Sequence, residues 1–291
     1  MPTLLRSIIS GHLGQIILIL AGIIVAVYLG LNPSPTTTNP LDLVSDTMAA
    51  AAAVKFLTVP SVSKHTATVI FVHGLGDTGH GWKPVADMFR ADPALAHVKW
   101  ILPHSPIRSV KANMGMEMPS WFDIYSFGFD TDEDEMGMLQ SARLINQLIT
   151  TEVESGTDPS RIVLGGFSQG ATMSLLTGLT GERKLAGIAV LSGWLPLRQK
   201  FKAMSSQHAS SIPVFWGHGS IDPLVKFQFC KDSSDFLVKS LGIPLLTNTN
   251  EFKGLTYNIY DGMGHTTNQR ELDDLKTWIT KAIPEDVRPS T

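Results

Sequence analysis

A serine at the tip of a glycine-rich turn is the residue of this chain with the clearest chemical potential. Residues 165–170 read Gly-Gly-Phe-Ser-Gln-Gly, after an apolar run at 161–164 and before residues typical of a helix. Gly166 and Gly170 flank Ser168 in the spacing G-x-S-x-G, which lets a strand turn sharply into a helix. Such a turn holds the hydroxyl above a sheet and aims helix amides at developing negative charge. The pattern predicts that Ser168 is a nucleophile in acyl transfer.

A serine hydroxyl needs a histidine to accept its proton, because it is a poor nucleophile at neutral pH. In enzymes with this turn the chain order is Ser, then Asp or Glu, then His. The histidines after Ser168 are His208, His218 and His265. We expect His265 to be the base, since it lies between the last predicted strand and the last predicted helix, where open α/β folds build sites. His208 lies in a polar, serine-rich stretch, and His218, which follows a strand, is the competitor.

The histidine in turn needs a carboxylate that fixes its tautomer. Asp222 follows the next-to-last predicted strand by one short turn, where the acid of such a triad belongs. Asp261 is the alternative, although its place at the end of the last predicted strand suits a loop cap better. An ordinary turn at Asp222-Pro223 is the non-catalytic interpretation.

Acyl transfer also needs an oxyanion hole made of two backbone amides. Gln169 follows the nucleophile and supplies the first amide. Leu75 is the expected second donor, because it lies in a glycine-rich loop after the predicted strand at 67–73. His73 and His80 could suggest a metal site, but glycines separate them and no acid pair lies nearby. We expect no metal and no cofactor, and expect His73 to orient the loop.

Strand-like and helix-like runs alternate from residue 55 onward. The expected strands are 67–73, 99–103, 161–166, 186–192, 213–217 and 255–260, and the expected helices are 82–89, 133–153, 169–179, 227–241 and 268–283. This alternation predicts an α/β fold whose mostly parallel central sheet carries helices on both faces. With 291 residues, of which 43% are apolar, the chain can bury a sizeable core.

The beginning of the chain differs from the rest in composition. Residues 16–31 are uncharged and almost wholly apolar, slightly short of the about 20 residues that cross a bilayer. We predict an apolar helix within residues 1–31 that anchors the protein in a membrane, with a cleaved signal peptide or a non-spanning segment as alternatives. A Pro- and Thr-rich linker is expected over 32–54, a catalytic domain over 55–285 and a tail over 286–291. A second translation start at Met48 would give a soluble catalytic body.

Charge and cysteine content bear on partners and compartment. A net charge of −3 gives no electrostatic reason to expect nucleic acid. The single cysteine, Cys230, excludes an intrachain disulfide, and the absence of an N-x-[ST] acceptor likewise gives no sign of secretion. Arg6 before the apolar segment and Asp42 after it would instead place the body outside the cytosol by the positive-inside rule. The sequence leaves both orientations open.

Six stretches together resemble the acyl-protein thioesterase family, a branch of the α/β-hydrolases close to small carboxylesterases and lysophospholipases. They read FVHGLGDTGHGW at 71–82, PSWFDI at 119–124, RIVLGGFSQG at 161–170, LSGWLPL at 191–197, GHGSIDP at 217–223 and GMGH at 262–265. The resemblance implies an α/β-hydrolase fold and hydrolysis of the thioester between palmitate and a protein cysteine, with side activity on lysophospholipids and small esters. For the site it implies a Ser168, Asp222 and His265 triad, with Leu75 and Gln169 as oxyanion donors and Trp121 in the acyl-site wall.

Two features depart from the family pattern. Family members are mostly soluble and cytoplasmic, and residues 16–31 have no counterpart in them. After Asp222 the family usually reads Pro-Val-Val-Pro, whereas this chain has Lys226 at the last of these positions.

Two other functions compete with thioester hydrolysis. One is a carboxylesterase or lysophospholipase with the same triad, and the other is a membrane-tethered binding module, against which the complete triad argues.

Overall fold

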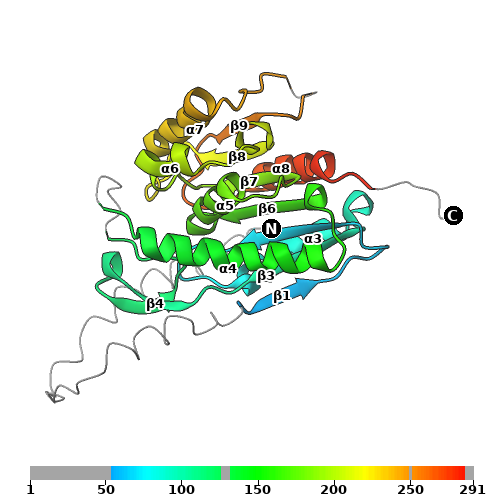
Figure 1. Cartoon of the computed structure of the whole chain (residues 1–291), viewed down its shortest axis with the longest axis horizontal. Helices are drawn as coiled ribbons and strands as arrows, with labels where there is room; N and C mark the ends of the chain where they lie inside the picture. Colours follow the sequence, from blue (N-terminus) through cyan, green and yellow to red (C-terminus); the bar gives the residue numbers. More distant parts are fainter. Residues whose placement is uncertain (1–53, 126–131, 249–250, 286–291) are drawn as a thin grey trace, which may run out of the picture. The chain divides into compact units, whose positions relative to one another are not determined.

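A seven-stranded sheet forms the centre of the protein (Figure 1). The computed structural model describes residues 54–125, 132–248 and 251–285. The strand order is β1-β3-β2-β6-β7-β8-β9, and every neighbouring pair is parallel except β1 with β3. The strands are β1 (Phe56–Val59), β2 (Ala67–Val72), β3 (Val98–Pro103), β6 (Ile162–Phe167), β7 (Gly187–Leu191), β8 (Val214–Gly219) and β9 (Leu255–Tyr260). A separate antiparallel hairpin joins β4 (Ile107–Val110) to β5 (Met116–Pro119).

Helices cover both faces of the sheet, and side chains of its inner strands alternate between two apolar clusters. In β2, Ile70 and Val72 belong to one cluster, and Val69 and Phe71 to the other. The first cluster contains α4 (Glu135–Glu154), α5 (Gln169–Thr180), α6 (Arg198–Met204) and α7 (Phe227–Leu241), and the second contains α3 (Gly79–Arg90) and α8 (Gln269–Ala282). Short 3-10 turns lie at Pro93–Leu95, Lys111–Asn113, Pro159–Arg161 and Ala209–Ser211. The predicted parallel sheet with helices on both faces is confirmed.

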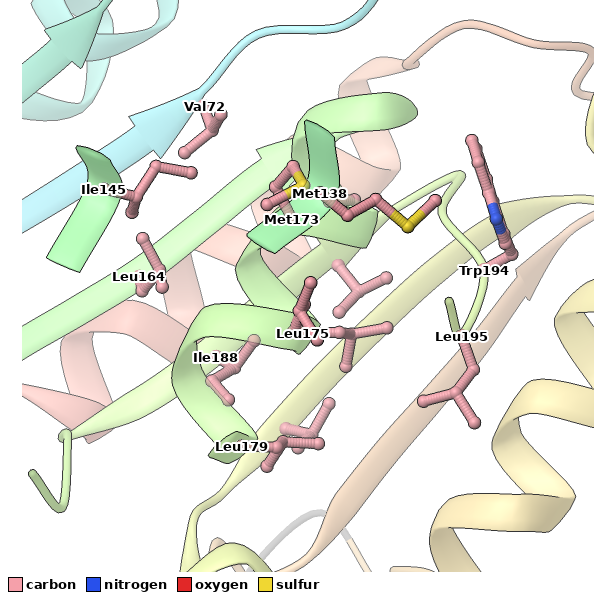
Figure 2. Close-up of a cluster of buried hydrophobic side chains, with 14 of the residues drawn as sticks. Val72, Met138, Ile145, Leu164, Met173, Leu175, Leu179, Ile188, Trp194 and Leu195 are labelled. Carbon is pink, nitrogen blue, oxygen red and sulfur yellow. The ribbon is translucent and has the colours of Figure 1, made fainter. Parts of the chain in front are cut away.

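Helix α5 is the most deeply buried helix among the described residues. Its residues from Gln169 to Leu179 are all buried, so it has no polar face toward solvent. Figure 2 shows its side chains Met173, Leu175 and Leu179 among those of the neighbouring strands and of α4. A helix enclosed in this way is held rigidly, which suits it to present a reactive residue at its N-terminus.

All six predicted strands and five predicted helices are present, with boundaries shifted by a few residues. Helix α3 begins before the predicted start because Thr78 caps it, its side chain accepting a hydrogen bond from the His80 amide. Strand β1, the β4–β5 hairpin and α6 were not predicted. They are short, and in α6 only Phe201 is buried, so no apolar periodicity marks them.

The predicted N-terminal apolar helix lies outside the described residues. Within the described ranges, no helix combines the length and apolar character needed to cross a bilayer.

Cys230 of α7 is enclosed in the first cluster. Its Sγ lies 3.2 Å from the Tyr257 hydroxyl, and burial raises the pKa of the thiol to about 12. The thiol is therefore neutral at physiological pH.

A buried carboxyl group lies where α8 packs on β8. The Glu271 side chain is fully buried, and neither of its oxygens has a hydrogen-bond partner among the described residues. Gly217 makes room for it, since a Cβ there would lie 2.3 Å from Glu271 Oε1. Burial, with the charge of Asp274 as a smaller cause, raises the pKa of Glu271 to about 8.

Glu271→Gln should therefore make the protein more stable than wild type, increasingly so as the pH rises. In the folded protein Glu271 is neutral below about pH 8, whereas in the unfolded chain it ionises above its ordinary pKa near 4.5. The free energy of unfolding of the wild type therefore falls as the pH rises from 4.5 to 8, by at most about 1.4 kcal/mol per pH unit. Denaturant titrations of both proteins at pH 5, 6, 7 and 8 would measure the difference. A difference that does not change with pH would contradict the assignment.

Candidate active site

The turn between β6 and α5 holds Ser168 in a strained conformation. Its φ is 53° and its ψ is −119°, a backbone region that L-residues rarely adopt. The flanking glycines make this turn possible because their positions leave no space for a side chain. A Cβ on Gly166 would lie 2.5 Å from the Gly170 carbonyl carbon, and one on Gly170 would lie 2.1 Å from the Val72 oxygen. The strand–turn–helix context predicted for Ser168 is confirmed.

Ser168, His265 and Asp222 form a continuous chain of hydrogen bonds. His265 Nε2 lies 2.9 Å from Ser168 Oγ, and His265 Nδ1 lies 2.7 Å from Asp222 Oδ2. Since a carboxylate only accepts, Nδ1–H donates to Asp222 and leaves Nε2 to accept the serine proton. The three residues follow β6, β9 and β8, whose carboxyl ends lie at one edge of the parallel sheet. This arrangement can deprotonate a serine as it attacks a carbonyl carbon.

The environment of Asp222 keeps its carboxylate ionised. Its Oδ1 accepts hydrogen bonds from the backbone amides of Leu224 and Val225, each at 2.9 Å. Burial alone would raise the pKa of Asp222, but its hydrogen bond and charge interaction with His265 and the two amide bonds outweigh burial and lower the pKa. A carboxylate that stays charged can hold the Nδ1–H tautomer and stabilise the imidazolium.

The competing histidines are not bonded to Ser168 in the structure. His218 is fully buried at the end of β8, and its Nε2–H donates to the Val225 carbonyl at 2.8 Å. Burial lowers the pKa of His218, which keeps the ring neutral. The side chain thus anchors the loop that carries Asp222. His208 precedes the 3-10 turn Ala209–Ser211.

Asp261 belongs to a different hydrogen-bond group from the triad. Its Oδ1 accepts from the Ser220 hydroxyl at 3.1 Å, and Ser220 Oγ accepts from the Gly262 amide at 2.9 Å. These bonds join the loops after β8 and β9. Asp261 therefore has the loop-capping contacts expected for it.

The loop after β2 brings Leu75 next to the nucleophile. Leu75 and Ser168 line the same cavity, and a Cβ on the preceding residue, Gly74, would lie 3.3 Å from Ser168 Cβ. Gln169 is the first residue of α5, so its amide belongs to the unpaired amides of the helix N-terminus. Both predicted oxyanion donors thus adjoin Ser168.

An apolar cavity of about 380 Å³ opens at Ser168 and His265. Its other walls include Ile124, Phe167, Trp194, Leu224 and Val225, together with Asn113 and Asp77. A larger cavity of about 670 Å³ shares Ile124 and Trp194 with it. The sequence reasoning did not select Ile124 or Trp194, although both lie in stretches that carried the family resemblance.

Trp121 does not line this cavity, in contrast to the expectation from the resemblance. Its side chain is fully buried, and its indole Nε1–H donates to the His73 carbonyl at 3.0 Å. The chain turns so that Ile124, rather than Trp121, lies on the wall.

The possible metal pair does not form a ligand set. Both ring nitrogens of His73 are occupied, by the Gly74 carbonyl at 2.7 Å and the Ser105 amide at 3.0 Å. Nowhere in the described residues do three or more His, Cys, Asp or Glu side chains gather in a way that could hold a metal ion.

Comparisons with known proteins agree with the fold and indicate a family. The Phospholipase/Carboxylesterase family model matches residues 54–283. Acyl-protein thioesterase 1 of Cryptococcus neoformans is 49% identical over 236 residues, covering 79% of this chain and 98% of the relative. The crystal structure of Arabidopsis thaliana SOBER1 has a TM-score of 0.68 and 28% identity, covering 75% of this chain and 99% of that one. The structure of Zea mays acyl-protein thioesterase 2 has a TM-score of 0.66 and 28% identity, covering 79% and 99%.

These matches confirm the α/β-hydrolase fold and the resemblance to acyl-protein thioesterases that the sequence suggested. They extend over nearly the whole described part of the chain. This chain is therefore a member of the Phospholipase/Carboxylesterase family.

Proposed function

We propose that this protein is a serine hydrolase that cleaves the thioester between a long-chain fatty acid, such as palmitate, and cysteines of acylated proteins. The observation that carries the proposal is the hydrogen-bonded chain of Ser168, His265 and Asp222 at the mouth of an apolar cavity. The names of the relatives support the substrate class, since proteins 49% identical over most of their length are called acyl-protein thioesterases.

In the proposed mechanism, Ser168 Oγ attacks the thioester carbonyl carbon while His265 Nε2 takes its proton. The negative oxygen of the tetrahedral intermediate accepts hydrogen bonds from the amides of Leu75 and Gln169. The C–S bond then breaks, and the imidazolium gives its proton to the departing cysteine sulfur. Water, deprotonated by His265, releases the fatty acid from the acyl-enzyme. Asp222 holds the imidazole in the required tautomer throughout.

The apolar cavity supports a fatty acyl group on the substrate. Ile124, Phe167, Trp194, Leu224 and Val225 offer aliphatic and aromatic surface next to the nucleophile. Removing an alkyl chain from water gains about 0.8 kcal/mol per methylene. Binding energy from a long acyl chain can therefore position the carbonyl carbon at Ser168.

Hydrolysis of oxygen esters is the second candidate function. An oxygen ester passes through the same tetrahedral intermediate, and the matching family includes phospholipases and carboxylesterases by name. Lysophospholipids, which carry one acyl chain on an ester, suit the same cavity. A binding module without catalysis is disfavoured because Ser168, His265 and Asp222 are all present and connected.

We propose further that residues 16–31 tether the enzyme to a membrane and that the triad belongs to a separate domain over 55–285. The apolar composition of the segment and the Pro/Thr-rich linker over 32–54 support this division. The single buried cysteine suits a catalytic domain on the cytoplasmic side.

Replacing the nucleophile tests the proposed activity. Ser168→Ala should lower kcat on a palmitoylated peptide by several orders of magnitude, because the acyl-enzyme cannot form. Turnover of the peptide and of a lysophospholipid should be measured for wild type and variant, with circular dichroism as the folding control. Near-normal turnover in the variant would refute the assignment of Ser168. A wild type that cleaves only the lysophospholipid would favour the second candidate function.

The acid assignment has a matched control within the same pair of loops. Asp222→Asn should lower kcat on the order of 10⁴-fold, because the amide allows the wrong imidazole tautomer. Asp261→Asn keeps an oxygen that can accept from Ser220 and should leave kcat within about twofold, since Asp261 contacts no triad residue. Steady-state kinetics of both variants decide the matter. If Asp261→Asn were the more damaging change, the acid would be misassigned.

The tether proposal predicts how loss of the N-terminal segment affects activity. A chain that begins at Met48 should keep full kcat on a soluble palmitoylated peptide, because the segment supplies no residue of the site. On palmitoylated protein bound to vesicles its rate should fall, since tethering raises the effective concentration of the enzyme. A Met48 chain that folds but does not cleave the soluble peptide would show that the segment belongs to the acyl site.

A further inference from the structure

Trp121 joins the two loops that carry the proposed oxyanion donors. Its indole Nε1–H donates to the His73 carbonyl at 3.0 Å, on the loop that continues to Leu75. Its backbone amide donates to the side-chain Oε1 of Gln169 at 2.8 Å, at the start of α5. One fully buried residue thus connects the loop after β2 with the turn after β6.

The Gln169 side chain also bonds to the residues on either side of Trp121. Its Nε2 donates to the Phe122 carbonyl at 2.7 Å and to the Ser120 hydroxyl at 3.1 Å. Only one orientation of the amide satisfies these bonds together with the Trp121 amide, because an N–H must face each acceptor. The Ser141 hydroxyl of α4 also donates to the Trp121 carbonyl. The segment is therefore held to α5 and α4 by bonds that leave it little freedom.

The oxyanion loop is anchored at further points. His73 Nδ1–H donates to the Gly74 carbonyl and Nε2 accepts from the Ser105 amide, so both bonds require the neutral ring. Burial of His73 lowers its pKa and favours that form. The Gly76 amide donates to the Pro119 carbonyl at 2.8 Å. The loop around Leu75 is thereby attached to the same 119–122 segment as Gln169.

We propose that Trp121 is a positioning residue that sets the separation of the two oxyanion donors through its hydrogen bond to the His73 carbonyl. This inference rests on the proposed oxyanion roles of Leu75 and Gln169. Such donors act only when they lie about 2.7–3.1 Å from the developing oxyanion. The Leu75 amide belongs to a different loop from the Gln169 amide, so its distance from that point depends on how the loops are tied. The indole N–H of Trp121 bonds to the first loop and its backbone N–H bonds to the Gln169 side chain, so Trp121 links the two.

The test removes that N–H while keeping an aromatic ring. Trp121→Phe should lower kcat on a palmitoylated peptide roughly tenfold, less than the 10²–10³-fold that loss of a whole oxyanion donor costs. KM should stay within about twofold, because ground-state binding in the acyl cavity is unaffected. Affinity for an alkyl boronic acid, which forms a tetrahedral anionic adduct on serine, should fall by about the same factor as kcat.

Trp100→Phe is the matched control. Trp100 is an equally buried tryptophan on β3, packed against Phe89, and its Nε1 has no hydrogen-bond partner among the described residues. The Trp100→Phe protein should lose stability through the same loss of ring volume, yet retain the kcat and the boronic acid affinity of the wild type. Gln169→Met supplies a second variant, since it keeps the backbone amide but loses the side-chain bonds to Trp121 and Phe122. It should show the same lowered kcat at nearly constant KM.

The outcomes separate the inference from the function on which it rests. Loss of kcat and boronic acid affinity in Trp121→Phe and Gln169→Met, but not in Trp100→Phe, supports the positioning role. Unchanged kcat in a folded Trp121→Phe protein overturns it, as does an equal loss in Trp100→Phe. Should Trp121→Phe fail to fold, retained kcat in Gln169→Met overturns the inference by itself. Failure of the proposed function would instead appear as Ser168→Ala activity near that of wild type.

Discussion

The first turn of α5 lies in close contact with the end of β2, and the remaining geometry of the site depends on this contact. At Gly170, any side chain would overlap the Val72 carbonyl oxygen, and at Gly166 it would overlap Gly170 itself. These two positions must therefore be glycine for the helix to begin so near the strand. The approach brings Ser168 beside the loop after β2, so that one reacting carbonyl group can meet both the proposed nucleophile and the proposed oxyanion donors.

Buried polar side chains hold the loops of the candidate site in place around this contact. The His218 side chain donates to the Val225 carbonyl in the loop that carries Asp222. The His73 ring donates to the Gly74 carbonyl of its own loop. The Gln169 side chain bonds the start of α5 to the 120–122 segment. Each of these side chains is fully buried, and each bonds mainly to backbone groups. Hydrogen bonds made away from water are strong and directional, so loops without regular secondary structure acquire the rigidity of a core. The strained backbone of Ser168 can persist because its surroundings determine it so completely.

Much of this arrangement could be predicted from the sequence, and the limits have physical causes. The strands and helices of the sheet were predictable because burial on two faces leaves continuous apolar runs and periodic helices. Ser168, Asp222 and His265 could be proposed from the sequence because their chain order and their positions after β6, β8 and β9 suit the chemistry, and the structure brings the three side chains together. The β4–β5 hairpin was missed, since a short exposed pair of strands has no such periodicity.

The position of Trp121 shows a different limit. Its position in the PSWFDI stretch indicated closeness to the site, but a tryptophan can line a cavity or lie behind it, and only the path of the chain decides between them. Similarly, the burial of Glu271 follows from the contact between α8 and β8, which no local pattern in the sequence records. Contacts made through backbone carbonyls, such as those of His218 and Trp121, place little restriction on neighbouring residue types. They therefore leave little trace in composition or spacing.

The burial of Cys230 has a consequence for the chemistry of sulfur in this enzyme. Thioesters exchange readily with free thiolates, so an accessible cysteine near the site could capture the acyl group and divert it from water. This chain has a single cysteine, and its thiol is enclosed in the core with a pKa raised to about 12. The Cys230 thiol therefore does not compete with Ser168 for the acyl group. Burial therefore protects Cys230 of the folded protein from acylation by transthioesterification.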